Sequence, residues 1–474
     1  MSQAIIKKDL TLLSRETLVR LTFYITIALV IGSLVTGFQR EQVFEKEKSA
    51  ALATDKAVWM DQGDRNPHSA AHFSRYAFRP ASPLAMLDPG TTDFAGLAVW
   101  MEAHYQDPAV FRRAEDAGEL SRFARLTPAF LVLTVGPLLV FLMLFSSVAG
   151  EREDGTLRQL LATGVSSRQF FNGKFRAGLR LTLLAFTAVY VPAALAAVAL
   201  TPADAGGDAI VRAAALYVVY AAYLVACVCI AIGVSAWFRT RQAAFLALTA
   251  VWALMAILVP RFAADLGTTL YPQPDAWEAS TRLRAASDIY YADMDRRTRI
   301  EEEVLDRYNV TSIEALPINY GAYVLQYSEE LSEPEFDRFY NDLDDRYAEQ
   351  EGVLRWLSLL TPTVAAANLS RGIAGTDRAH QRSFAQAAEA RRRDMIQLLN
   401  EDYMYNADNS GAVYTADAEL WAKFEDLDYR MPELRHIAAA YGADLALLLL
   451  WLIAAFLVAS RAVGRAVRGE VAAA

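Results

Sequence analysis

Long uncharged apolar segments recur along the chain and set its pattern. Five of them, each 18 to 26 residues long, contain no charged side chain, and a sixth contains a single one, Asp444. About 20 apolar residues in a helix cross the hydrocarbon core of a membrane. These segments are expected as helices because a helix satisfies its backbone hydrogen bonds internally. The pattern therefore predicts an all-α integral membrane protein with six transmembrane helices.

The six spans divide the rest of the chain into short loops, two termini and two long insertions. We expect an amphipathic cytoplasmic helix at 1–20, a cytoplasmic loop at 150–178 and a cytoplasmic tail at 460–474. The insertions, at 39–125 and 261–436, are predicted to be two mainly helical extracytoplasmic domains. The spans are predicted at 21–38, 126–149, 179–200, 213–238, 242–260 and 437–459.

Helical patterns extend through much of both insertions. The first span is expected to continue as a helix to Met60. Residues 274–309 have no internal proline or glycine, which predicts one helix. The Ser-Glu-Pro-Glu segment at 332–335 has the sequence of a capping box and predicts the start of another. A further helix is expected from about 376 to 400.

The distribution of charge predicts the orientation. With the N-terminus inside, the segments on that side carry 15 basic and six acidic side chains, whereas the first insertion has a net charge of −2 and the second −14. Lysine and arginine are retained on the cytoplasmic side. Both termini are therefore expected in the cytoplasm and both insertions outside it. Acidic insertions do not favour nucleic acid as a partner.

Composition and cysteine content exclude other classes. The chain is 54% hydrophobic, above the roughly 45–50% of soluble proteins. Its two cysteines, Cys227 and Cys229, are two residues apart in the fourth span and point to different helix faces. They are expected to form neither a disulfide nor a paired metal clamp, so the insertions fold without disulfides.

The cytoplasmic loop at 150–178 is the most informative segment. Gly155 is expected to break the helix of the second span, and Thr156 to cap a short new one. Leu157, Leu160 and Leu161 then form an apolar stripe at positions i, i+3 and i+4. Such a helix could dock into a groove of a cytoplasmic partner, or lie at the interface and merely turn the chain round.

The same loop resembles the signature of the ABC-2-type transporter permeases. The resemblance rests on the run from Glu151 to Leu157, the Leu160-Leu161 pair, Ser167-Arg168 and Gly173-Lys174. Gly164 departs from the pattern, because a proline is common there. In that family the loop carries a coupling helix that receives an ATPase, and residues 1–20 resemble its elbow helix. The resemblance implies as coupling residues Glu151, Glu153, Gly155, Thr156, Leu157, Leu160, Leu161 and Arg168.

The insertions resemble one branch of this family, with a large domain between the first two spans and another between the last two. The motifs are found at 66–73, 78–80, 87–90, 99–104 and 375–377. The resemblance implies the permease subunit of an ATP-driven exporter in the inner membrane, with periplasmic insertions. Its expected partners are two copies of a cytoplasmic ABC ATPase, an identical or paralogous second permease, membrane lipid and a periplasmic protein. ATP and magnesium are expected on the ATPase, and no cofactor on this chain.

The chain is not expected to be an enzyme by itself. It has no Gly-x-x-x-x-Gly-Lys-Ser/Thr loop, since Gly173-Lys174 is followed by Phe175. A nucleophile elbow and a zinc-protease pattern are absent too. The alternative function is a membrane-anchored sensor or scaffold that binds a periplasmic ligand or partner, which would need no nucleotide-dependent movement.

Three further features have open interpretations. His68 and His72 are weak metal candidates at i and i+4, with His104 in the same insertion, but Pro67 places His68 at a helix start and structural hydrogen bonding is favoured, so no metal is predicted. The many tyrosines of the second insertion either line a cleft or, as favoured, pack between helices. Asp444 either serves a pathway or a pairing role, or contacts water and headgroups.

Overall fold

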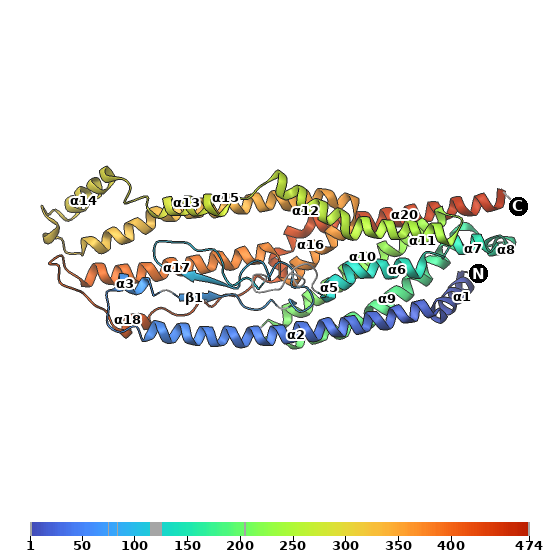
Figure 1. Ribbon diagram of the computed structural model, residues 1–474, viewed down its shortest axis with the longest axis horizontal. Coiled ribbons are helices and arrows are strands. Elements are labelled where there is room, and N and C mark those ends of the chain that lie inside the picture. The colour runs from blue at the N-terminus through green and yellow to red at the C-terminus, as the bar shows by residue number, and fades with distance from the viewer. Residues whose placement is uncertain (1, 74, 83, 114–125, 203–204, 473–474) are drawn as a thin grey trace.

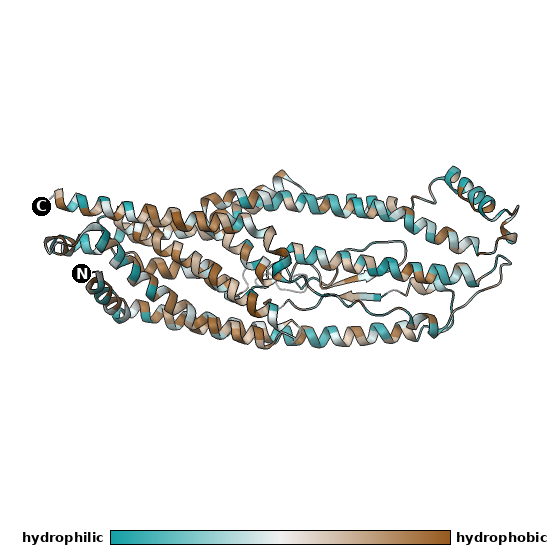
Figure 2. Cartoon of the chain, turned by 180° about the vertical axis from the view of Figure 1, so that it is seen from behind, coloured by the Kyte–Doolittle hydropathy of each residue, from teal (hydrophilic) through white to brown (hydrophobic). Residues whose placement is uncertain are grey.

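The computed structural model describes residues 2–73, 75–82, 84–113, 126–202 and 205–472. The molecule is elongated, with both termini at one end and the two insertions at the other (Figure 1). We call these the coupling end and the insertion end. Hydrophobic residues are concentrated in the half that holds the termini, and hydrophilic residues in the other half (Figure 2). The ends of the predicted first insertion and tail, at 114–125 and 473–474, lie outside the described residues.

Within the described residues, six helices are long and apolar enough to cross a membrane, and the structure is 75% helical. The predicted fold class and the six spans are confirmed. The first span is α2 (Thr17–Met60), preceded by α1 (Ser2–Arg15), and the third and fourth are α9 (Ser167–Ala199) and α10 (Gly206–Trp237). The second comprises α5 (Pro128–Phe130), η1 (Leu131–Val135), α6 (Gly136–Leu144) and α7 (Ala149–Glu153). The fifth comprises α11 (Arg241–Ala253), η2 (Leu254–Leu258) and α12 (Val259–Leu270), and the sixth α19 (Leu434–Ile437), η5 (Ala438–Tyr441) and α20 (Gly442–Ala472).

Two spans contain a π-helical turn, η1 and η2, just before a proline. Proline has no N–H, so a carbonyl one turn earlier loses its usual partner. In η1 the Leu133 carbonyl accepts from the Tyr223 hydroxyl at 2.8 Å, and the Thr134 carbonyl accepts from Trp252 Nε1 at 2.8 Å. In η2 the Met255 carbonyl accepts from Thr361 Oγ1 at 2.9 Å. Neighbouring helices therefore supply the donors that the widened turns need within the bundle.

The insertions share a core of their own at the insertion end. The first contains α3 (Pro67–Ala71) and an antiparallel pair, β1 (Arg75–Phe78) and β2 (Ala98–Met101). The second contains α13 (Ala276–Ser287), α14 (Met294–Tyr308), η3 (Ile313–Ala315), α15 (Tyr320–Leu357), η4 (Ser358–Leu360), α16 (Pro362–Ala374), α17 (Arg378–Asn406) and α18 (Ala418–Ala422). Trp59 at the end of α2 packs on Trp421 of α18, and its Nε1 donates to the Trp421 carbonyl at 2.9 Å. Apolar residues of both insertions thus form one cluster.

The structure corrects two helix predictions in the second insertion. Residues 274–309 form two helices, because the chain turns after Ser287 and Asp293 caps α14 by accepting from the Arg296 N–H at 2.9 Å. No helix starts at 332–335: α15 runs through Pro334. Phe336 lies fully buried on α15, which packs against α17. This tertiary packing offsets the cost of about 3 kcal/mol that an interior proline imposes. The predicted continuation of α2 to Met60 is observed.

One helix of the second insertion lies among the spans, which the sequence pattern did not indicate. α16 contacts both α10 and α20, and Ala365, Ala366 and Leu369 belong to the main core of the bundle. At its end, the fully buried Arg212 of α10 donates to the Ile373 carbonyl at 2.9 Å. The second insertion is therefore joined to the bundle through α16 and not only through its connections.

Candidate functional site

The end of the second span and the loop after it form two short helices at the coupling end, α7 and α8 (Thr156–Ala162) (Figure 1). Gly155 separates them with φ of 72°, a left-handed conformation that glycine adopts without strain. The predicted helix break is therefore observed. The prediction that Thr156 is the cap is wrong, because Gly155 occupies that position. The Thr156 hydroxyl turns back and donates to the Glu151 carboxylate, which competes with a capping role.

A buried ionic cluster joins this loop to α1 and α9. Lys174 Nζ donates to Glu151 Oε1 at 2.8 Å and to Asp9 Oδ1 at 3.0 Å. Lys8 Nζ donates to the same Glu151 oxygen at 2.9 Å. Burial raises the pKa of the Asp9 carboxyl, although the adjacent Lys174 ammonium acts in the opposite direction. Buried charges need such partners, because a lone one costs several kcal/mol.

Gly173 allows α1 to lie directly on α9. A Cβ atom at this position would be 2.7 Å from Ile5 Cγ2, and Ile5 is buried. Real side chains do not approach so closely, so another residue would displace α1. The Gly173-Lys174 pair that closes the loop motif thus has two physical roles: the glycine permits the contact, and the lysine reaches Glu151 and Asp9.

The apolar stripe of α8 faces the chain's own core. Leu157 is fully buried in the main core, and Leu160 and Leu161 pack against that core while half-buried. Gln159 and Ala162 are exposed on α8. The leucines therefore fix α8 in place, and a partner that received this helix would meet its polar outer face. The predicted residues Glu153 and Arg168 are also exposed at this end.

Two arginines that the sequence analysis did not select attach the loop to other spans. Arg152 Nε lies 3.3 Å from Glu470 Oε1, and Arg158 Nε lies 2.9 Å from Glu470 Oε2. Arg152 Nη1 also donates to the Phe238 carbonyl after α10 at 3.0 Å. The mixed charge of the motif signalled ion pairing, but nothing in the sequence indicated a partner near the end of α20.

The acidic residues beside Gly155 bind Arg241 at the start of α11. Glu153 Oε2 accepts from the Arg241 backbone N–H at 2.7 Å, and Asp154 Oδ1 accepts from Arg241 Nη1 at 2.9 Å. The hydrogen bond from Arg241 lowers the pKa of Asp154. The loop is thus fastened to four spans, by Lys174 to α9, by Phe238 to α10, by Arg241 to α11 and by Glu470 to α20.

Asp444 lies near the opposite end of α20 and is buried there. Its Oδ2 is 3.3 Å from Arg355 Nε of α15, and its Oδ1 accepts from Asn368 Nδ2 of α16 at 3.0 Å. Since 1% of its surface is exposed, the Asp444 side chain does not contact water or lipid headgroups. Of the three interpretations, the structure supports pairing, and a role in a pathway stays a prediction.

The remaining candidates divide into packing residues and one side-chain cluster. Tyr290 is buried against Tyr327, with ring centroids 5.8 Å apart, in an apolar cluster that also contains Tyr320, Tyr323 and Tyr403. The tyrosines therefore pack together inside the second insertion, as the sequence analysis favoured. Cys227 and Cys229 are free and buried in α10. His68 and His72, by contrast, are brought together with His104.

Two family models match the chain. Residues 103–272 match the ABC-2 family transporter proteins, and residues 278–430 match a family described as "Domain of unknown function (DUF3526)". No curated protein matches. The first match confirms the resemblance found in the loop: residues 103–272 are similar to the membrane domain of ABC-2-type permeases, which are multi-pass membrane components of ABC transporters. Permeases of this family work with an ABC ATPase.

Proposed function

We propose that the chain is the permease subunit of an ATP-driven exporter and that α8 couples it to ATP hydrolysis by a separate cytoplasmic ATPase. The observation that carries the proposal is the attachment of α7 and α8 to four spans through Glu151, Arg152, Asp154 and Arg158. A helix held only by its own loop could move without effect on the membrane domain. A helix held in this way transmits a displacement to the bundle.

The path of a displacement across the membrane follows α20. At the coupling end Glu470 pairs with Arg158 of α8, and near the other end Asp444 pairs with Arg355 of α15. The two acids are separated by 26 residues of one helix, or about 39 Å at 1.5 Å per residue. Closure of the ATPase dimer on ATP would push α8 and move α20, and α15 and α16 would follow at the insertion end.

The assembly that this mechanism needs is larger than one chain. We propose two permeases, identical or paralogous, and two ATPases that bind ATP and magnesium. The substrate would cross at the interface between the permeases, and the insertions would gate the pathway or pass the substrate to a periplasmic partner. The basic bias of the segments at the coupling end supports a cytoplasmic location of both termini, in the inner membrane.

Affinity purification of the detergent-solubilised chain from its native membrane tests the proposal. We expect an ABC ATPase at one copy per permease. Substitution of the exposed Ala162 by arginine on α8 is expected to reduce ATPase recovery at least about tenfold, with the amount of permease in the membrane unchanged. Ala276→Arg, an exposed position at the insertion end, is the matched control. Equal ATPase recovery from both variants would contradict the role of α8. Recovery of a periplasmic protein without any ATPase would favour the sensor or scaffold.

A further inference from the structure

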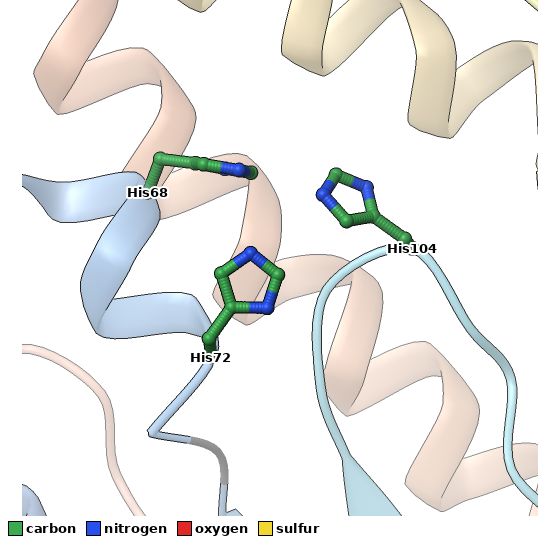
Figure 3. Close-up of side chains that lie close together, drawn as sticks. All are labelled: His68, His72 and His104. Carbon is green, nitrogen blue, oxygen red and sulfur yellow. The ribbon is translucent and has the colours of Figure 1, made fainter.

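Three histidine rings converge at the insertion end. His68 and His72 come from α3 and its C-terminal residue, and His104 from the loop after β2 (Figure 3). The ring centroids are 5.0, 5.1 and 5.3 Å apart. One nitrogen atom of each ring lies within 4.8 Å of one nitrogen of each of the others. The cluster is far from α8 along the molecule, so its chemistry is independent of the coupling site.

Local structure holds the first two rings on one side. Asn66 caps α3 by accepting from the His68 N–H at 2.9 Å, and Pro67 occupies the first turn. The expected helix start at His68 is therefore observed. One turn later His72 ends the helix, and a spacing of four residues places both rings on the same face. The capped turn of α3 therefore places both rings on the same side.

The third ring is held in a backbone conformation that is unfavourable for it. His104 has φ of 69°, in the left-handed region, where a non-glycine residue has a cost of about 1–2 kcal/mol. Glu329 of α15 offsets this cost, because its Oε1 accepts from the His104 backbone N–H at 2.7 Å and lies 2.8 Å from His104 Nδ1. Strain of this kind, kept by specific contacts, is typical of functional positions.

The carboxylate behind His104 assigns the roles of the ring nitrogens. Glu329 Oε1 lies 2.8 Å from His104 Nδ1, and its Oε2 pairs with Arg392 Nη1 at 3.3 Å, so the group is paired as a carboxylate. An ionised carboxylate at Nδ1 keeps the proton on that atom and leaves the Nε2 lone pair free. Metal-binding histidines in proteins commonly have this arrangement, in which one ring nitrogen donates to a carboxylate and the other is free to bind the ion.

Hydrogen bonding does not account for every ring nitrogen of the cluster. His68 Nδ1 is buried and makes no hydrogen bond within the described part of the chain. Glu329 therefore holds His104, whereas the buried Nδ1 of His68 has only the nearby Asn400 side chain and no hydrogen bond within 3.5 Å in the described residues.

We propose that His68, His72 and His104 bind one divalent transition-metal ion, with Zn²⁺ as the reference ion. Three imidazoles without a thiolate suit Zn²⁺, Cu²⁺ and Ni²⁺ and leave a fourth position open. Zn–N distances of about 2.0–2.1 Å in a tetrahedral site place two ligand nitrogens about 3.3 Å apart. The three histidine nitrogens lie within 4.8 Å of one another, so they would move closer by up to about 1.5 Å to bind the ion. The exposed side chain of His72 gives an ion access.

The metal site would be linked to the second insertion through one contact shell. All three histidines belong to the first insertion, and Glu329, which holds His104, belongs to the second. Arg392 of α17 completes the link: its Nη1 lies 3.3 Å from Glu329 Oε2 and donates to the Glu102 carbonyl at 3.1 Å. A bound ion therefore adds stability to the contact between the insertions and not only to one loop.

The test uses the full chain, purified in detergent without a polyhistidine tag and freed of metal with a chelator. Titration with Zn²⁺ against a fluorescent chelator is expected to give one site per chain, with a Kd in or below the micromolar range. Co²⁺ in the same site is expected to give a tetrahedral spectrum without the charge-transfer bands of thiolate ligands, which excludes Cys227 and Cys229.

Variants distinguish this site from adventitious binding. His72→Ala, at an exposed position that the fold tolerates, and His104→Ala are expected to weaken Zn²⁺ binding at least about 100-fold. Glu329→Gln, which keeps all three ligands, is expected to weaken it by about 10–100-fold. His436→Ala, an exposed histidine outside the cluster, is the control and should not change the affinity. Absence of one-to-one binding of Zn²⁺, Cu²⁺ and Ni²⁺ to the folded chain, or an unchanged Kd for His72→Ala, would overturn the proposal.

Discussion

Lys174 of α9 and Glu151 of α7 form a buried ion pair, with Nζ and Oε1 2.8 Å apart. Both residues belong to the motif of the cytoplasmic loop, 23 positions apart, and Asp9 of α1 shares the same lysine. The pair thus fixes the loop and the elbow helix against one span. This gives a physical reason for the presence of a lysine at the end of a motif whose other members were expected to contact a partner.

Substitution of Lys174 by methionine tests the pair. The variant leaves Glu151 and Asp9 buried without the lysine that they share, while the half-exposed Lys8 stays beside Glu151, and we expect a loss of about 3–5 kcal/mol in the free energy of unfolding. Thermal unfolding in detergent measures it. Lys7→Met, at an exposed position on α1, is the control. Addition of Asp9→Asn to the variant should recover part of the loss, and equal melting temperatures for the two lysine variants would refute the argument.

Gly173→Ala tests the close packing of α1 on α9. The new methyl group would meet Ile5 at 2.7 Å, so we expect a cost of about 1–3 kcal/mol and faster amide exchange in α1. Ile5→Ala is expected to restore α1 when it is combined with the glycine variant. Gly464→Ala in α20, where the new Cβ would lie 3.7 Å from Arg468 Nη1, an ordinary contact distance, should have little effect. No rescue by Ile5→Ala would show that the cost has another origin.

A double-mutant cycle on Asp444 and Arg355 distinguishes pairing from a direct pathway role. If the two act as a pair, Asp444→Asn and Arg355→Gln each lower the melting temperature, and the double variant is about 1 kcal/mol more stable than their sum predicts. Asp428→Asn, at an exposed position, is the control. Additive effects on stability, together with a loss of transport-linked ATPase activity for Asp444→Asn alone, would favour the pathway.

The pH dependence of metal binding is a further prediction from the histidine cluster. Protons compete with the ion for the imidazoles. Since the pKa of His68 is about 4, below its ordinary value of 6.5, Zn²⁺ binding should persist at about pH 6 and weaken as the pH falls further. Zinc titrations across this range measure it. The titratable groups that interact with His68 are His72, His104 and Glu329.

The metal-free chain should lose stability in the same range. The folded-state pKa of His68 is lower than its unfolded value, so the unfolded chain binds more protons as the pH falls. The contribution of neutral His68 is therefore complete above about pH 6.5 and is lost as the pH falls toward about 4. His68→Gln should flatten this dependence. A melting temperature that changes equally with pH in both proteins would contradict the assignment.

Much of the membrane architecture could be predicted because its causes are local. A bilayer demands about 20 uncharged residues in a helix, and the sequence shows each such segment directly. Gly155 likewise predicted a helix break, because glycine adopts a left-handed conformation without strain. Predictions from local sequence were wrong where tertiary contacts determine the conformation. α15 passes through Pro334 because its buried face packs on α17, and Thr156 bonds to Glu151 instead of capping α8.

The functional residues divide in the same way. Six spans, the motif in the loop at 150–178 and the pair of histidines one helical turn apart could be recognised from the sequence, since each depends on spacing along the chain. Four features were seen first in the tertiary structure. The leucines of α8 face inward, α16 enters the bundle, Glu470 holds the loop and His104 completes the cluster. These depend on contacts between residues tens to hundreds of positions apart, and the packing of whole helices, which no local spacing encodes, sets them.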